Sequence, residues 1–506
     1  MEEERRPEIV CTTVLFYTYF PVPLPVAAAD ALQLEMEALC ASLGSLKGRV
    51  LISLDGINGT LGGIGEDVAA FQSGIETLLP PPLLTEIDWK TSRFPMPVSG
   101  APFPDMRVKR VGEIVSSSGR LSTVGVGSRE SGGTHISPEE FHATLAAAKE
   151  GDDLVVLDVR NRFEVAVGHF VDGAGRTAVQ PEMRTFEQFA AFVDRASTGD
   201  DALLTGKRVV MYCTGGIRCE TASAYLKAKS GAKSVAQLDG GIHRYLDAFP
   251  GADGTRDGGF FAGRNFVFDQ RIAVGSDGTA APSMEEAALA RAAGVTPAVG
   301  CCVECGDAWD TLSPGAVCTV CVCLTLVCPR CRAEGAARVG PRGLRAAAGP
   351  HAAAAAPSAA AATDAGLPRR YEWFCNAHRY LRESFVHFVD EYELSALVEH
   401  RAALEALVAL ANAAIASGEP PPLHARAEPD MARRDRRTLE RQVRRLHSRI
   451  ATLRKGRKGT AVRAADAARR CRHCKREECD GKCWGFWKAP ALPQSKKTAV
   501  TLAAKP

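Results

Sequence analysis

The 506-residue sequence lacks any uncharged apolar run that approaches 18 residues without proline, so no membrane-spanning helix is expected. It also lacks the positively charged start of a secretory signal peptide, because it begins Met1-Glu-Glu-Glu-Arg-Arg6 and its next apolar stretch contains Pro21, Pro23 and Pro25. We find no internal repeat and no glycine fingerprint for a dinucleotide, so no nucleotide cofactor is expected. The sequence therefore predicts a soluble intracellular protein, with the cytoplasm as its first expected location and the nucleus as the second.

The net charge of the chain is only +3, but it is unevenly distributed. Residues 431–506 hold 23 Lys and Arg against 6 Asp and Glu, which leaves −14 on the rest of the chain. A basic tail predicts an anionic partner, with nucleic acid as the first candidate. The chain also has 17 cysteines. Without a secretory signal, these favour metal ligands and reactive thiols over disulfides.

Residues 431–470 combine this basic charge with one apolar stripe. At spacings of three and four come Leu439, Val443, Leu446, Ile450 and Leu453. This pattern is typical of a helix that docks on a partner helix, for which residues 392–417 are the candidate, and it leaves a cationic face for RNA phosphate. A solvated helical face, or a nuclear-import signal at residues 454–458, is the alternative interpretation.

The N-terminal third of the chain has a mixed pattern of strands and helices. The predicted elements are a strand at 9–20, a helix at 27–43, strands at 49–54 and 59–62 joined by a hairpin turn at 55–58, a helix at 65–78 and an extended segment at 85–94. This order, βαββαβ, matches the ferredoxin-like motif. We assign it to residues 1–115, an α+β domain, followed by a Ser- and Gly-rich linker at 116–134.

Residues 135–275 alternate between buried strands and helices. The strands are predicted at 154–158, 208–212 and 234–238, and the helices at 182–195 and 220–229. Such alternation predicts an α/β domain with a parallel sheet. Beyond it we predict a cysteine-rich zinc-type module at 296–332, a low-complexity linker at 333–368, a helical, basic region at 369–465, a cysteine knuckle at 466–488 and a disordered tail at 489–506.

One cysteine stands between a predicted buried strand and a predicted helix. Cys213 begins a six-residue loop that ends at Arg218, where inward-pointing N–H groups, the positive end of the helix dipole and the Arg218 charge all stabilise a thiolate. Such a loop suits a persulfide or a phosphate equally well. The alternative is a buried cysteine before an ordinary helix. We predict Cys213 and Arg218 as catalytic, with an active-site loop of Thr214, Gly215, Gly216 and Ile217.

The segment Cys213-Thr-Gly-Gly-Ile-Arg218 resembles the active-site loop of rhodanese domains, which carry sulfur as a cysteine persulfide. Residues 157–170 resemble the "DVR…E…GH" segment of rhodaneses, and residues 238–245 resemble the strand-turn after their active-site helix. The resemblance implies that Asp158 and Arg160 form a structural ion pair beside the loop.

A narrower resemblance covers more of the chain. Asp55-Gly-Ile-Asn58, the segment 212–220 and Phe266-Val-Phe-Asp-Gln-Arg271 together resemble the rhodanese-like family of bacterial oxygen-dependent tRNA uridine hydroxylases and their eukaryotic rhodanese-domain relatives. It implies an acylphosphatase-like N-terminal domain, tRNA as partner, molecular oxygen as co-substrate, and 5-hydroxylation of the wobble uridine through an essential loop cysteine, here Cys213. Cys219 belongs to the family pattern, either as a resolving thiol or as a packed residue.

Two cysteine clusters predict zinc. Two C-x₂-C knuckles with the spacing of a four-thiolate site are formed by Cys302, Cys305, Cys328 and Cys331. Between them lie Cys318, Cys321 and Cys323, and the C-x₄-C of the related family favours Cys318 and Cys323 as further ligands. With Cys301 there are enough thiols for one site with spares or for two sites. A cluster of reduced thiols that binds no metal is the alternative.

The second cluster lies in the basic tail. A short segment there contains four cysteines beside Trp484, Phe486 and Trp487. It is too small to bury a hydrophobic core and would need a bound metal ion to fold. The predicted ligands are Cys471, Cys474, Cys479 and Cys483. The neighbouring Lys, Arg and aromatic side chains also suit phosphate contact and base stacking. Packing of the aromatic rings on the metal site is the alternative interpretation.

We therefore expect a multidomain α/β plus α+β enzyme that hydroxylates tRNA wobble uridine through Cys213. The first alternative is a rhodanese sulfurtransferase that receives sulfur from a donor, and the second is an RNA-binding protein with a rhodanese scaffold. An intact Cys213 and Arg218 weigh against the scaffold, and the N-terminal domain favours a large RNA substrate over simple sulfur transfer. No facial triad for iron is evident.

Overall fold

A computed structural model describes residues 10–79, 87–95, 102–117, 119, 121, 132–198, 203–250, 259–269, 271–275, 286–289, 298–313, 316–321, 323–335, 373–381, 394–417 and 429–454. The chain divides into two compact units. The first runs to Cys302 and includes Gly306–Leu312, and the second holds Val303–Cys305 and the chain from Ser313 onward. None of the helices in the described ranges is long and apolar enough to cross a membrane.

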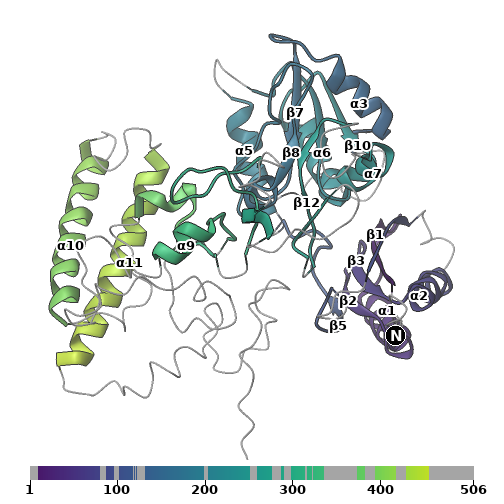
Figure 1. Ribbon diagram of the computed structural model, residues 1–506, viewed down its shortest axis with the longest axis horizontal. Coiled ribbons are helices and arrows are strands. Elements are labelled where there is room, and N and C mark those ends of the chain that lie inside the picture. Colours follow the sequence, from purple (N-terminus) through teal and green to yellow (C-terminus); the bar gives the residue numbers. More distant parts are fainter. Residues whose placement is uncertain are drawn as a thin grey trace, which may run out of the picture. The chain divides into compact units, whose positions relative to one another are not determined.

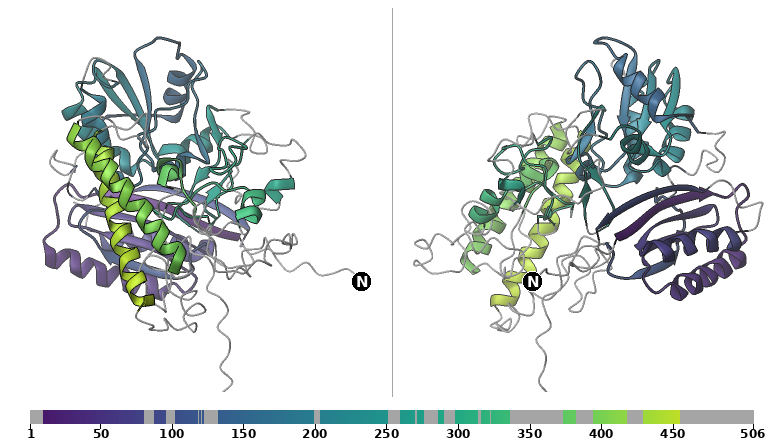
Figure 2. Two further views of the ribbon diagram at one scale, coloured as in Figure 1. Left: turned by 90° about the vertical axis from the view of Figure 1, so that its left-hand side faces the viewer. Right: turned by 45° about the vertical axis from the view of Figure 1, so that its right-hand side comes forward.

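The first unit begins with a five-stranded sheet in the order β4-β1-β3-β2-β5. Its elements are β1 (Val10–Tyr19), α1 (Val26–Ser42), β2 (Lys47–Ile52), β3 (Gly56–Gly63), α2 (Gly65–Leu78), β4 (Asp88–Pro95) and β5 (Met106–Arg110). The first four strands are antiparallel neighbours, and β5 adds to β2 in parallel. Both helices cover one face of the sheet (Figure 2), where their apolar sides bury Met36, Phe71 and Ile75. The ferredoxin-like order expected from the sequence is confirmed.

The hairpin between β2 and β3 differs from the prediction. The predicted turn at 55–58 lies partly inside β3, because Gly56, Ile57 and Asn58 pair with β1 and the turn occupies residues 53–55. Ser53 N–H donates to the Gly56 carbonyl at 2.9 Å, which closes a tighter turn than the Asp-Gly pattern indicates. A side chain on Gly56 would collide with the backbone of Thr18, so this glycine serves close strand packing.

The next region of the first unit is a four-stranded parallel sheet in the order β6-β10-β9-β7. Its strands are β6 (Thr134–Ile136), β7 (Leu154–Asp158), β9 (Arg208–Tyr212) and β10 (Ser234–Leu238), and its helices include α3 (Pro138–Ala146), α4 (Arg162–Val165), α5 (Phe189–Ala196), α6 (Ile217–Lys229) and α7 (Gly241–Ala248). Short elements complete it: β8 (Gly168–Phe170), η2 (Phe186–Gln188), β11 (Phe261–Gly263), β12 (Asn265–Phe266) and β13 (Ala273–Val274). The predicted helix at 182–195 is the pair η2 and α5, and α6 begins three residues before the predicted start.

Helices cover both faces of this parallel sheet, as its uninterrupted apolar strands require. Alternate residues of β7 face opposite layers, with Val155 and Leu157 packing against α5 and α6 while Leu154 and Val156 pack against α3 and α7. Part of the predicted linker belongs to the domain, since Leu121 is buried in the α5–α6 layer and Thr134 begins β6. The sheet thus presents the carboxyl end of β9, where Cys213 follows, between two helical layers.

In the second unit, α9 (Pro329–Gly335) and η5 (Asn376–Leu381) follow cysteines, and two long helices form a hairpin. Helices α10 (Leu394–Ser417) and α11 (Pro429–Arg454) lie side by side (Figures 1 and 2). The apolar stripe predicted on α11 packs against α10, with Leu439, Leu446 and Ile450 buried against Leu397 and Leu404. On α11, Arg437, Arg441, Arg444 and Arg454 are exposed. The low-complexity segment at 333–368 falls almost entirely outside the described residues, and the knuckle at 466–488 and the tail at 489–506 fall wholly outside them.

Candidate active site and metal centres

Cys213 is the first residue after β9 and is fully buried. The loop that follows curls around its sulfur, and the N–H of Gly216 donates to Cys213 Sγ at 3.1 Å. Gly216 has a φ of 94°, a conformation that favours glycine, and it caps α6. The predicted loop from Thr214 to Ile217 therefore lies where the sequence places it, at the N-terminus of a helix whose dipole favours negative charge.

The loop is braced by the first turn of α7. The N–H of Ile242 donates to the Cys213 carbonyl at 3.0 Å, and the N–H of His243 donates to the Thr214 carbonyl at 3.1 Å. Gly241 has a φ of 66°, and a Cβ on it would lie 2.6 Å from the Cys213 carbonyl oxygen. This close approach explains why position 241 is a glycine: the segment 238–245 packs directly against the backbone of the loop.

The surroundings of Cys213 favour its thiolate. Burial opposes the charge, but a hydrogen bond from the Cys219 thiol, the Arg218 guanidinium and the backbone N–H groups of the loop outweigh it. Together they lower the pKa of Cys213 from 9.0 to about 5. At neutral pH Cys213 is therefore a thiolate, the nucleophilic form of cysteine.

Cys219 lies on the first turn of α6 and is fully buried. Burial and the hydrogen bond to Cys213 raise the pKa of Cys219 well above the usual value. It is thus a neutral thiol that donates to the Cys213 thiolate. Cys219 is therefore packed, as one of the two interpretations made from the sequence has it, and its role as a resolving thiol stays a prediction.

The Arg218 guanidinium makes a bidentate ion pair that the sequence analysis did not assign. Its two terminal nitrogens donate to the Glu164 carboxylate at 2.8 and 2.7 Å, and one also donates to Thr214 Oγ1 at 3.2 Å. Glu164 is completely buried, and burial of Arg218 is offset by this carboxylate, which raises the pKa of Arg218. Glu164 is the glutamate of the "DVR…E…GH" segment, so that segment contained the signal for this pair.

Asp158 and Arg160 form the ion pair implied by the rhodanese resemblance. Arg160 Nη2 donates to Asp158 Oδ2 at 2.7 Å and to the Gly168 carbonyl at 2.5 Å, and both charged side chains are completely buried. This pair ties the end of β7 to β8, beside the loop and not in it.

The ferredoxin-like sheet supplies residues to the loop that the sequence analysis did not assign. On β1, Tyr17 Oη donates to Glu220 Oε1 at 3.1 Å, and the Leu15 side chain lies 2.3 Å from where a Cβ on Gly215 would stand. A side chain at position 215 would therefore collide with β1. Nothing in the local sequence of the loop indicates this neighbour, because it lies about 200 residues upstream.

Lys90 on β4 is a buried cation in the same surroundings. Its ammonium pairs with Asp88 and lies 4.6 Å from the centre of the Tyr17 ring, with none of its side chain exposed. Burial lowers the pKa of Lys90, while Asp88 and the Cys213 thiolate favour its charge. Asp88 also pairs with Arg244 of α7. The active-site loop is thus enclosed by charged and aromatic groups from both domains of the first unit.

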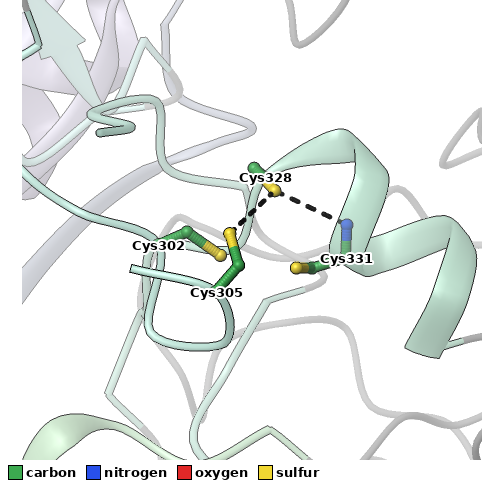
Figure 3. A group of neighbouring side chains, drawn as sticks. All are labelled: Cys302, Cys305, Cys328 and Cys331. Carbon is green, nitrogen blue, oxygen red and sulfur yellow. Dashed lines mark hydrogen bonds between the residues drawn. The ribbon is translucent and has the colours of Figure 1, made fainter. Parts of the chain in front are cut away.

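The four thiols of the two predicted knuckles come together in one group (Figure 3). The sulfurs of Cys302, Cys305, Cys328 and Cys331 all lie within 4.8 Å of one another. The Sγ atoms of Cys305 and Cys328 are 3.8 Å apart. In a tetrahedral site with zinc–sulfur bonds of about 2.3 Å, two sulfurs lie about 3.8 Å apart, so this group fits zinc.

Cys318 and Cys323 do not share a group. The second group within the described residues joins Cys318 to Cys321, Cys375 and His378, and Cys323 lies outside it, with a hydrogen bond between its thiol and that of Cys321. Two of these ligand positions, Cys375 and His378, lie in the region that the sequence analysis assigned as helical and basic, with no metal ligand predicted in it. The cysteines predicted at 471, 474, 479 and 483 fall outside the described residues.

Three protein-family models match the chain. The UPF0176 acylphosphatase-like domain matches residues 11–114, the rhodanese-like domain matches 139–248, and the rhodanase C-terminal model matches 262–341. These matches cover both domains of the first unit and the cysteine-rich segment.

Several curated proteins are similar over the same region. A tRNA uridine(34) hydroxylase of Pseudarthrobacter chlorophenolicus is 41% identical, over 51% of this chain and 79% of that protein. A tRNA uridine(34) hydroxylase of Shouchella clausii is 36% identical, over 52% of this chain and 71% of that protein. Rhodanese-like domain-containing protein 6 of Arabidopsis thaliana is 35% identical, over 64% of this chain but only 51% of that protein, so the chain spans about half the length of the plant relative.

Proposed function

Because this chain belongs to the family of tRNA uridine(34) hydroxylases, we propose that it hydroxylates the wobble uridine of tRNA at C5, with Cys213 as the covalent catalyst. The observation that carries the proposal is the Cys213 thiolate, whose pKa of about 5 is set by the loop that encloses it. A thiolate is the form of cysteine that adds to an electrophilic carbon. A tRNA substrate is consistent with an intracellular site of action.

The proposed reaction begins when the Cys213 sulfur bonds to C6 of uracil and the C5–C6 electron pair moves to C5 and O4 as an enolate. The enolate carbon passes its electrons to molecular oxygen and, with one proton, becomes a C5 hydroperoxide. Two electrons and two protons from a dithiol reductant break the O–O bond and release water, leaving a C5 hydroxyl and a disulfide. Loss of the C5 proton then expels the thiolate and restores the ring double bond.

The N-terminal domain contributes to this proposal in two ways. It places the buried Lys90 cation where it attracts the Cys213 charge, and such a cation also stabilises the negative charge that develops on an enolate oxygen. It also covers the loop, because Leu15 and Tyr17 of β1 contact it and Cys213 is fully buried. We therefore propose that uridine enters when β1 separates from the loop.

Trapping with tRNA that contains 5-fluorouridine tests the covalent step. Fluorine at C5 blocks the loss of a C5 proton, so the adduct at C6 persists, and we expect a protein–tRNA band that requires Cys213. Cys40→Ser is the matched control, because Cys40 is also a buried thiol but lies on α1 and not in the Cys213 loop. This variant should leave the band unchanged. An adduct that survives in Cys213→Ser would contradict the proposal.

The match to the rhodanese-like domain favours a second candidate, sulfur transfer. In that reaction the Cys213 thiolate takes the outer sulfur of thiosulfate, releasing sulfite, and the persulfide passes it to cyanide as thiocyanate. The loop N–H groups suit a persulfide as well as a thiolate. Thiocyanate formation without tRNA hydroxylation would favour this candidate over the first.

We also propose that the group formed by Cys302, Cys305, Cys328 and Cys331 holds a structural zinc ion. The 3.8 Å sulfur separation and the two knuckles support this assignment. The cysteines in the tail at 471–483 stay a prediction of a further zinc site. We assign the exposed arginines of α11 to contact with tRNA phosphate, on the strength of their charge and of the apolar side that docks on α10.

A further inference from the structure

The second thiol group differs from the first because one of its four positions is a histidine and because its members lie far apart in the sequence. Cys318 and Cys321 form one knuckle, and Cys375 and His378 form another after a gap of more than fifty residues. All four side chains are buried, and none of the three cysteines forms a disulfide. Three thiolates and one imidazole are an ordinary ligand set for structural zinc.

The distances match a tetrahedral site. With zinc–sulfur bonds of about 2.3 Å and zinc–nitrogen bonds of about 2.0–2.1 Å, two sulfurs should lie about 3.8 Å apart and a sulfur and a nitrogen about 3.6 Å apart. Cys321 Sγ and Cys375 Sγ are 3.8 Å apart. His378 Nδ1 lies 3.8 Å from Cys318 Sγ and 3.3 Å from Cys375 Sγ, values on either side of the expected one.

A disulfide does not explain this group. A bonded pair of sulfurs is about 2.05 Å apart, far less than the observed separation, and a disulfide would leave the imidazole without a role. His378 Nδ1 is directed at two different sulfurs, as a metal ligand would be. The backbone supports the arrangement, because Cys318 bridges to Trp373 and the Thr319 N–H donates to the Trp373 carbonyl at 2.7 Å.

The ligand pairs of the two groups alternate along the chain. The pair 302/305 belongs to the first group, 318/321 to the second, 328/331 to the first and 375/378 to the second. We propose that Cys318, Cys321, Cys375 and His378 bind a second zinc ion. The two ions then form a cross-brace. The first ion joins the segments before and after the pair 318/321, and the second joins the segments before and after the pair 328/331. Residues 373–381 are then tied to the cysteine-rich module by metal.

The test is the zinc content of the full-length protein, measured by plasma mass spectrometry after purification without chelator. Cys375→Ser and His378→Ala should each hold about one zinc ion fewer per chain, because each opens a four-ligand site. Cys323→Ser is the matched control, since Cys323 lies in the same segment but outside the group, and it should keep the full complement. Unchanged zinc in Cys375→Ser, or a loss in Cys323→Ser that Cys375→Ser does not show, would overturn the proposal.

A conservative variant separates loss of a ligand from loss of the fold. His378→Cys supplies a fourth thiolate and should retain all the zinc. After cobalt replaces zinc, the thiolate-to-cobalt absorbance of this site should rise by about one third, as three thiolates become four. The proposal fails if His378→Cys binds as little zinc as His378→Ala, or if its cobalt absorbance equals that of the unsubstituted protein.

Discussion

At the scale of single residues, the reactivity of Cys213 depends on a balance of opposing effects on its pKa. Burial raises the pKa of the thiol, while Cys219, Arg218 and the loop N–H groups lower it, and the lowering effects win. The loop N–H groups, the helix dipole and the Arg218 charge were the reasons expected from the sequence. The structure adds a donated hydrogen bond from Cys219 and shows that the Arg218 charge is shared with Glu164.

The titration of Cys213 follows from this balance. Because its folded pKa of about 5 lies below the ordinary value of 9.0, the thiolate persists as pH falls from 9 and is protonated only near pH 5. The ultraviolet thiolate absorbance of the wild type minus that of Cys213→Ser should stay constant from pH 8 to pH 6 and decrease through about pH 5. The contribution of the Cys213 thiolate to the free energy of unfolding is complete above about pH 9 and is lost progressively towards pH 5. A midpoint near 9 would contradict the site as described.

The Glu164–Arg218 pair gives a second prediction at this scale. Glu164→Gln removes the charge that compensates a nearly buried guanidinium, and breaking a buried ion pair costs about 3–5 kcal/mol of unfolding free energy. Urea denaturation should show a loss in this range. Glu35→Gln on α1, an exposed glutamate, is the control and should change stability by less than about 0.5 kcal/mol. Equal stability of the two variants would mean that the pair is not formed.

At the scale of elements, the sequence patterns predicted those helices and strands whose position depends on their own residues. Helix α2 occupies the predicted residues, and the parallel strands follow the apolar runs, because burial on both faces requires continuous apolar sequence. The β2–β3 turn was displaced because Gly56 is needed for close strand contact and not for the turn. An Asp-Gly pair alone does not distinguish these two uses of glycine.

The hairpin of α10 and α11 is held by a narrow apolar seam, so a single deletion should loosen it. Leu446 is completely buried in this seam, and Leu446→Ala should cost about 2–5 kcal/mol. Hydrogen exchange should then become faster for the backbone amides of α10. His447→Ala, at the exposed neighbouring position, should leave exchange unchanged. Unaltered protection in Leu446→Ala would show that the seam does not hold the hairpin.

At the scale of the whole molecule, the parts of the site that the sequence did not reveal are those joined over long separations. Tyr17 and Lys90 reach the Cys213 loop from another domain, and Cys375 and His378 reach Cys318 from a distant segment. Motif spacing identifies residues that are close in sequence, and it carries no information on which domain covers a loop. The rhodanese loop was predictable for the opposite reason: strand, loop and helix are contiguous.

The basic face of α11 gives a prediction about tRNA. With about five to seven phosphate contacts in the basic region, the logarithm of tRNA affinity should fall with the logarithm of salt concentration with a slope of roughly −4 to −6. Replacing Arg437, Arg441 and Arg444 by Gln should weaken binding and flatten the slope by roughly 2–3 if each contacts one phosphate. Lys229→Gln, an exposed site on α6, is the control. An identical slope in the triple variant would assign the arginines to another partner.

Whether Cys213 catalyses hydroxylation can be measured by mass spectrometry of tRNA nucleosides from cells that lack their own uridine-34 hydroxylase. The cells express either this protein or Cys213→Ser under oxygen-18 gas. We expect 5-hydroxyuridine that carries one heavy oxygen with the unsubstituted protein, and none with Cys213→Ser, because a serine hydroxyl is a far poorer nucleophile at neutral pH than the Cys213 thiolate. Labelled 5-hydroxyuridine formed by Cys213→Ser, or none formed by the unsubstituted protein, would contradict it.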